Sequence, residues 1–179
     1  MMSLKIYLAG PDVFRRDAKQ LGQAKAIICA EYGFEGLFPL DSNVDLTGLS
    51  PYQSGLAIYQ ADIDLMNRCD LIIANMTPFR GPGLDGGTAF EMGYMRAQGK
   101  AVWGYTLDER DYGDRVEKDA EGWDIEDQHV EVFGMADNLM MVGAIDASGG
   151  QLLRVPGDSA NAEDHLRAFR KVVEALARA

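Results

Sequence analysis

The sequence predicts an α/β protein built on a parallel β-sheet. Short apolar runs rich in β-forming residues occur at 4–10, 70–76 and 101–106, and segments with helically spaced apolar residues lie between them. Glycine or proline marks most of the boundaries. Strands that alternate with helices in this way form parallel sheets with right-handed crossovers. The 179 residues fit one domain, 1–179, because no repeat or linker divides them.

The first half of the chain predicts two strands and two helices. The run "LKIYLAG" at 4–10 ends at a Gly-Pro pair and predicts a buried strand. A helix is expected from residue 14 to a glycine stop at Gly33, followed by a short strand at "GLFPL" and a loop over 41–50. The stretch 52–69 predicts a helix, and one face of it carries Leu56, Tyr59, Ile63 and Met66.

The second half predicts a strand at 70–76, a helix from about 88 to 99 and a strand at 101–106. Residues 107–130 hold ten acids and few apolar anchors, which is typical of a solvated loop or of a mobile lid over a site. The apolar segment "DNLMMVGAI" could be helix or strand, whereas 165–176 has the spacing of a packing helix.

Composition narrows the class of function. The net charge of −11 argues against phosphate-neutralising contact with nucleic acid and against an anionic membrane surface. No apolar run approaches the roughly 20 residues needed to cross a bilayer. Cys29 and Cys69 stand far apart without a Cys/His cluster, so we expect no metal site, no disulfide and a cytoplasmic protein. No cofactor is expected.

One glycine pattern is misleading. Gly81, Gly83 and Gly86 spell G-x-G-x-x-G between a strand and a helix, and Asp108 follows at the distance of a ribose-binding acid. The loop follows the third strand instead of the first, however, and Asp85 would repel a pyrophosphate. Too little sheet follows for a second nucleotide-binding half. We therefore do not expect a dinucleotide site.

Ligands of parallel α/β proteins bind beyond the carboxyl ends of the strands. Asn75 lies at such an end, and glycines such as Gly87 would let the next loop pass close to a ligand. Glu91 follows in the predicted helix. Thr88 to Glu91 also matches a T-x-x-E capping box, in which Glu91 would merely start the helix. This motif alone favours the structural role for Glu91.

Four motifs together resemble the nucleoside 2-deoxyribosyltransferase family. They are "KIYLAGP…F", "QADIDLMNRCDLIIANMTPFRG", "DGGTAFEMGYMRAQGKAV" and "DNLMM", and the run 70–100 is the most specific. The resemblance covers about 4–106 and 138–140. It implies a flavodoxin-like, Rossmann-like three-layer sandwich with a central parallel sheet of about five strands.

The resemblance also implies roles for individual residues. Glu91 matches the family's nucleophile, and Tyr7 matches the tyrosine that holds it. The resemblance therefore predicts that the Glu91 carboxylate points away from the Thr88 N–H and toward Tyr7. Asp62 and Asp85 match acids that handle the base and its proton, Asp85 also lying close to the sugar. Phe14 matches an aromatic residue beside the base, although the loop "AGPDVF" needs a one-residue adjustment to align.

The implied reaction breaks the N-glycosidic bond of a 2′-deoxynucleoside. A carboxylate would attack C1′ through an oxocarbenium-like transition state, and a second base would then attack the covalent sugar–Glu91 intermediate.

Asn138 and Met140 match an N-x-M pair that a neighbouring subunit contributes, so we expect a homodimer or a higher oligomer. Deoxynucleosides and free nucleobases are the expected substrates. We also expect the Glu91 carboxylate to stay ionised, because it would lie in the first turn of its helix, at the positive end of the helix dipole.

Two other functions stay open at this level. A related hydrolase would pass the sugar of a deoxynucleoside 5′-monophosphate to water and would need phosphate partners, for which Arg80 is available. A non-catalytic nucleotide-sensing module could use the same fold, since a fold does not imply a function. Asp85 near the sugar favours an uncharged 5′-hydroxyl over a phosphate.

Overall fold

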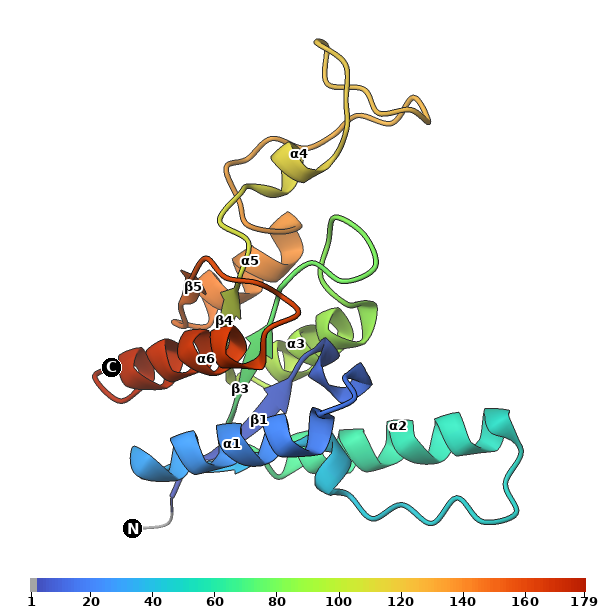
Figure 1. The fold of residues 1–179 in the computed structure, drawn as a ribbon, viewed down its shortest axis with the longest axis vertical. Coiled ribbons are helices and arrows are strands. Elements are labelled where there is room, and N and C mark those ends of the chain that lie inside the picture. The colour runs from blue at the N-terminus through green and yellow to red at the C-terminus, as the bar shows by residue number, and fades with distance from the viewer. Residues whose placement is uncertain (1–2) are drawn as a thin grey trace.

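The computed structural model describes residues 3–179 and contains one sheet of five parallel strands (Figure 1). The strands are β1 (Lys5–Ala9), β2 (Glu35–Leu37), β3 (Leu71–Asn75), β4 (Ala101–Thr106) and β5 (Leu152–Arg154). Their order is β2-β1-β3-β4-β5. This is the flavodoxin-like order, in which the chain reverses direction across the sheet at β1 and β3. The predicted α/β class and the five-stranded parallel sheet are confirmed.

Helices cover both faces of this sheet and make three layers (Figure 1). The α-helices are α1 (Ala18–Glu31), α2 (Pro51–Asn67), α3 (Gly86–Ala97), α4 (Tyr112–Arg115), α5 (Leu139–Ala147) and α6 (Ala162–Leu176), and the two 3-10 turns are η1 (Pro11–Phe14) and η2 (Pro39–Asp41). Helices α1 and α6 lie side by side on one face. Residues of α2, α3 and α5 pack on the other face.

Strand alternation decides which residue faces which layer. In β1, Ile6 and Leu8 pack with the α1/α6 layer, whereas Tyr7 and Ala9 pack with α2, α3 and α5. The three central strands β1, β3 and β4 are almost completely buried, as expected for a parallel sheet with helices on both faces. Tyr7, one of the predicted site residues, is 0% exposed and therefore lies inside the molecule.

The start of α3 differs from the predicted capping box. Asp85, not Thr88, is the N-cap: its Oδ2 accepts hydrogen bonds from the Thr88 backbone N–H at 2.9 Å and from the Thr88 hydroxyl at 3.1 Å. An acidic N-cap satisfies a free N–H and meets the positive end of the helix dipole. The helix therefore begins two residues earlier than predicted, and Glu91 is released from any capping role.

The N-terminal half of α2 extends beyond the sheet (Figure 1). Of the predicted face, only Ile63 and Met66 are buried, while Leu56 and Tyr59 are each 51% exposed. The helical periodicity was correct, but periodicity cannot say how far along its length a helix has a partner. The N-terminal turns of α2, which extend past the sheet, therefore expose an apolar face in the single chain.

The C-terminal third contains a strand that the sequence did not predict. The ambiguous segment forms α5, which is capped by the Asn138 side chain, and β5 then adds three residues to the sheet edge. So short an edge strand carries little periodic signal. The last helix is confirmed as α6, with His165 and Phe169 among its buried residues.

The acidic segment forms an arm that projects from the body (Figure 1, yellow to orange). It contains α4 and an isolated bridge between Trp123 and His129, and otherwise it is irregular, as predicted for a loop. Among residues 3–179, no helix combines the length and the apolar character needed to span a bilayer.

Candidate functional site

The centre of the candidate site is a contact between β1 and α3. The Tyr7 hydroxyl donates a hydrogen bond to Glu91 Oε1 at 2.6 Å. Tyr7 is the donor because burial and the adjacent Glu91 charge raise its pKa well above the ordinary value. The prediction that Glu91 turns toward Tyr7 is confirmed. Tyr7 in the sheet thus fixes one carboxylate oxygen of Glu91, and Glu91 takes no part in capping its own helix, α3.

Glu91 is held in a low-dielectric setting. Its pKa is raised from 4.5 to about 8, mainly by burial and also by the charges of Asp62 and Asp85, while the Tyr7 hydrogen bond opposes this rise. Glu91 is the sixth residue of α3, so it lies past the first turn, where the helix dipole acts most strongly. The expectation that the dipole keeps this carboxylate ionised in the free protein is therefore wrong.

Asp62 brings a second carboxyl group from α2. Burial raises its pKa from 3.8 to about 6. Asp64, two residues on, is exposed and accepts a hydrogen bond from Gln60, so it faces away from the site. With pKa values of about 8 for Glu91 and about 6 for Asp62, the two carboxyl groups together hold about one proton near neutral pH. Such sharing is how acid and base roles are divided between neighbouring carboxyl groups.

Asp85 adds a third carboxylate at the start of α3. Its Oδ2 is occupied by the cap contacts with Thr88, while no hydrogen bond to Oδ1 is recorded within residues 3–179. The cap orients the group and leaves one oxygen available. Gly87 lies directly against it, since a Cβ at Gly87 would come within 3.0 Å of Asp85 Oδ2. Gly87 therefore gives the carboxylate room.

Asn138 and Met140 are both exposed in the single chain. The Asn138 side chain accepts a hydrogen bond from the Met140 backbone N–H at 3.0 Å and caps α5, and its amide group is otherwise accessible. Met140 is 65% exposed. These positions suit residues that meet another molecule, although the geometry of one chain does not assign them to a site.

One predicted ligand-binding residue, Asn75, lies on the other side of the sheet. Asn75 is fully buried and points toward the α1/α6 layer, where its amide meets Asp12 and His165 and its carbonyl accepts the Thr77 N–H. That position does not support direct contact with a ligand beside Glu91. Alternation along β3 explains the difference, because the neighbours of Asn75 in sequence face the other layer.

Phe14 lies at the mouth of a small cavity between the β1 and β3 loops. Its ring stacks on Phe79 with a centroid distance of 5.3 Å, and the Arg80 guanidinium lies over the Phe79 ring at 4.5 Å. The cavity has a volume of about 170 Å³ and is lined by Phe14, Asn75 and His165. The aromatic pair offers a flat surface at the point where the sheet reverses its order.

A buried polar network on this side escaped the sequence reasoning. Lys25 donates to Asp12 Oδ2 at 2.6 Å and to the Tyr105 hydroxyl at 2.9 Å. His165 Nε2 donates to the Ser159 carbonyl, which leaves Nδ1 as the acceptor for the Asn75 amide. One signal was available: Lys25 occupies the same helical face as Leu21 and Ile28, where a charge needs a buried partner.

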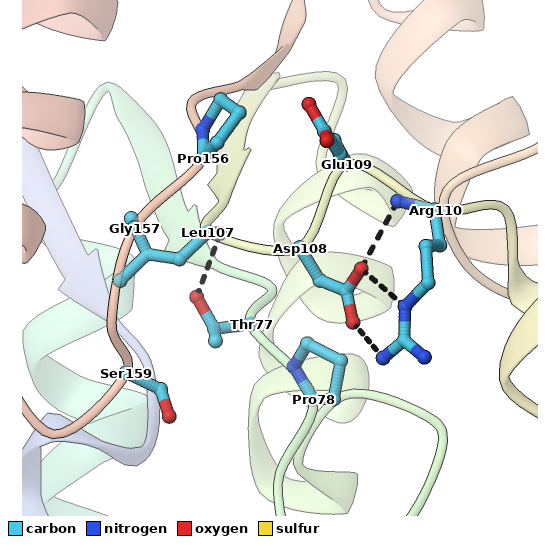
Figure 2. Close-up of a pocket in the computed structure, with 9 residues that line it drawn as sticks. All are labelled: Thr77, Pro78, Leu107, Asp108, Glu109, Arg110, Pro156, Gly157 and Ser159. Carbon is cyan, nitrogen blue, oxygen red and sulfur yellow. Dashed lines mark hydrogen bonds and ion pairs between the residues drawn. The ribbon is translucent and has the colours of Figure 1, made fainter.

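A larger hollow lies beyond the ends of β3 and β4 and is lined by residues such as Thr77, Asp108 and Ser159 (Figure 2). Its volume is about 380 Å³, and of its three charged lining residues, Asp108 and Arg110 pair with each other, while Glu109 is the third. None of the predicted site residues lines it. Within residues 3–179, no three His, Cys, Asp or Glu side chains are grouped to hold a metal ion.

Comparison with known proteins places this geometry in context. Among solved structures, 2-desoxiribosyltransferase from Leishmania mexicana superposes with a TM-score of 0.64 at 29% identity, covering 96% of this chain and 97% of that one. A conserved protein from Enterococcus faecalis superposes with a TM-score of 0.57 at 24% identity, covering 94% and 98%. The second likeness concerns the fold alone.

Two sequence comparisons add to this. An uncharacterized protein from Schizosaccharomyces pombe is 42% identical over 113 residues, which are 62% of this chain and 54% of that protein, so the chain spans about half the length of this relative. The family model described as nucleoside 2-deoxyribosyltransferase matches residues 6–140, a range that holds the whole carboxylate cluster and Tyr7. The chain therefore belongs to the nucleoside 2-deoxyribosyltransferase family.

Proposed function

We propose that this protein transfers 2-deoxyribose between nucleobases, with Glu91 as the nucleophile. The observation that carries the proposal is the 2.6 Å hydrogen bond from Tyr7 to Glu91 in a buried setting that raises the pKa of Glu91 to about 8. Glu91 itself is half-buried, and an oriented carboxyl group that is largely removed from water and caps no helix is costly to keep unless it reacts or binds. Family membership supplies the class of reaction.

In the first step, a Glu91 oxygen attacks C1′ of the deoxynucleoside. The bond from C1′ to the base nitrogen breaks, the electron pair leaves with the base, and the base takes a proton from Asp62. Negative charge beside the developing oxocarbenium ion lowers the barrier. In the second step, a nitrogen of an incoming base attacks C1′, the bond to Glu91 breaks and leaves its electron pair on the carboxylate, and the incoming base gives its N–H proton to Asp62.

These two reaction steps require the proton of the Asp62–Glu91 pair to lie on Asp62 at the moment of attack. In the free protein the higher pKa, about 8, belongs to Glu91 and the lower, about 6, to Asp62. A base that covers Asp62 removes it from water and raises its pKa, while the electron-poor sugar favours the ionised form of Glu91. Substrate binding would thus move the proton to the group that must donate it.

Asp85 supports a nucleoside substrate over a nucleotide. The α3 cap fixes its carboxylate, and the oxygen that Thr88 leaves open could accept a hydrogen bond from a sugar hydroxyl. A 5′-phosphate in that place would be repelled. We therefore propose that Asp85 accepts a hydrogen bond from the 5′-hydroxyl of the nucleoside.

A homo-oligomer would complete the site. The exposed positions of Asn138 and Met140 support a contribution from one subunit to its neighbour. Tyr59 and Phe90 add an exposed aromatic pair, Tyr59 one helical turn before Asp62 and Phe90 directly before Glu91. Light scattering tests this point. A monomer that is fully active at high dilution would remove the neighbouring subunit from the proposal.

Base exchange is the direct test of the reaction. The protein is incubated with deoxyinosine and adenine, and products are separated by chromatography. Transfer yields deoxyadenosine, whereas free deoxyribose alone would indicate the hydrolase. Glu91→Gln should abolish the product, and Asp64→Asn, on the outer face of α2, should not. Ligand-induced stabilisation without any turnover would favour the sensing module instead.

A further inference from the structure

Arg115 is a buried cation within the otherwise exposed acidic segment. Its side chain is 2% exposed, and its Nη2 lies 3.2 Å from Asp137 Oδ2, whose side chain is 4% exposed. A buried ion pair does little for stability compared with an apolar pair of the same size. Its value therefore lies in what it holds in place.

The Arg115 guanidinium joins several separate pieces of chain. Its Nε donates to the Pro82 carbonyl at 2.7 Å, its Nη2 to the Ala136 carbonyl at 2.6 Å, and its Nη1 to the Arg110 carbonyl at 3.3 Å. A planar guanidinium can serve acceptors in several fixed directions at once, which an ammonium group cannot do. The contact with Pro82 anchors the glycine-rich loop that leads into α3.

Asp137 completes the connection. Its Oδ2 accepts the Leu84 backbone N–H at 3.0 Å, and its Oδ1 accepts the Asn138 backbone N–H at 2.8 Å. Leu84 directly precedes Asp85, and Asn138 directly follows Asp137. One carboxylate thus fixes the backbone next to two residues that the family resemblance assigns to the substrate, and these residues come from segments more than fifty positions apart.

We propose that Arg115 and Asp137 are a positioning pair that sets where Asp85 stands and thereby controls recognition of the sugar 5′-hydroxyl. This inference rests on the proposed function. Neither residue touches the substrate. Loss of the pair would let the loop 81–85 move and would weaken the hydrogen bond from the 5′-hydroxyl to Asp85.

The test compares two substrates in four proteins. The kcat/KM values for a 2′-deoxynucleoside and for its 2′,5′-dideoxy analogue are measured in the wild type, Arg115→Lys, Asp137→Asn and Val172→Ala. A site built to bind a hydroxyl rejects the analogue that lacks it by a large factor. Arg115→Lys and Asp137→Asn should reduce this ratio about tenfold or more, through loss of activity on the hydroxyl-bearing substrate.

Val172→Ala is the control for general destabilisation. Val172 is a fully buried residue of α6, on the opposite side of the sheet from α3, so its truncation lowers the melting temperature without reaching the loop. It should keep the wild-type ratio. Should Asp137→Asn fail to fold, Arg115→Lys retains the charge and carries the test alone.

The outcomes separate this inference from the function beneath it. If the wild type exchanges no base, the proposed function falls. If the wild type exchanges bases but ignores the 5′-hydroxyl, or if both variants keep its preference, the positioning role is overturned while the transferase stands. A lowered ratio in the two variants with an unchanged ratio in Val172→Ala supports it.

Discussion

At the scale of single residues, the account depends on how the protein sets the protonation of one carboxyl group. Burial and neighbouring charges push the pKa of Glu91 up, and the Tyr7 hydroxyl opposes them. A nucleophile needs the ionised form. Tyr7 therefore acts by keeping more of Glu91 ionised at neutral pH, as well as by orienting it.

Tyr7→Phe should raise the pKa of Glu91 above about 8 because the hydrogen bond that stabilises the carboxylate is lost. A rise of about one unit would lower the rate near pH 7 about tenfold and leave the rate at high pH less affected. A pH–rate profile measures the shift of the acidic limb. Tyr94→Phe is the matched control, because its hydroxyl bonds Asn67. An unshifted limb in Tyr7→Phe would contradict this role.

Glu91→Gln should stabilise the fold at alkaline pH. The folded pKa of about 8 lies above the unfolded value of 4.5, so the native state binds the extra proton and its stability falls as pH rises between those values. Glutamine resembles the protonated form. The variant should therefore gain on the order of 2–3 kcal/mol over the wild type at pH 9 and little at pH 4.

Thermal unfolding of both proteins at the two pH values tests this expectation. An equal difference at both pH values would mean that Glu91 is not buried as an acid. A larger difference at pH 4 would reverse the sign and contradict the linkage.

At the scale of elements, the beginning of α3 decides how Asp85 is presented. Asp85 caps the helix, which fills the anion-attracting N-terminus with the protein's own carboxylate. This explains why a glycine-rich loop ahead of a helix need not bind phosphate. The adjacent glycines serve different purposes, since a Cβ at Gly86 meets nothing within 4 Å, whereas one at Gly87 meets Asp85 at 3.0 Å.

Gly87→Ala should therefore displace the Asp85 carboxylate and lower kcat/KM about tenfold, while Gly86→Ala should leave it unchanged. Both substitutions favour helical conformation, by up to about 1 kcal/mol, so propensity cannot explain a difference between them. Steady-state kinetics of the pair is the measurement. Equal activity in the two variants would show that Asp85 needs no room at this point.

At the scale of the whole molecule, the buried network around Lys25 joins the sheet to the α1/α6 layer. Lys25 Nζ lies 2.6 Å from Asp12 Oδ2, and both side chains are 2% exposed. Removing one partner of such a pair leaves an uncompensated charge in the interior. The network therefore specifies how the layers meet without contributing a group to the Glu91 site.

Lys25→Met should lower the free energy of unfolding by about 3–5 kcal/mol because Asp12 loses its counter-ion. Lys19→Met, on the exposed side of the same helix, should change it by less than about 0.5 kcal/mol. Urea unfolding gives both numbers. Similar effects from the two variants would mean that the pair is accessible to water.

Sequence reasoning identified the fold class and the central contact because each left a local signal. Apolar runs predicted β1, β3 and β4, and the motif resemblance predicted that Glu91 meets Tyr7. The three-residue β5 left almost no pattern. The cap at Asp85 was assigned to Thr88 because both residues fit a capping pattern, and only backbone geometry separates them.

The remaining differences have tertiary causes. Asn75 was placed at the correct end of its strand, but strand alternation turned it toward the other layer. The helical face of α2 was recognised without the length over which it packs. The Arg115–Asp137 pair joins distant segments, and no spacing in the sequence relates them. The sequence pattern does not predict which distant residue a buried charged side chain will pair with.

The most direct test of the account is to look for the bond between Glu91 and the sugar. The protein is incubated with a slowly reacting fluorinated deoxynucleoside analogue and analysed by intact and peptide mass spectrometry, with Glu91→Gln as the control. The account predicts one added sugar mass on the peptide that contains Glu91 and none in the variant. Base exchange with an adduct on another residue, or with no adduct under conditions that trap the sugar, would contradict it.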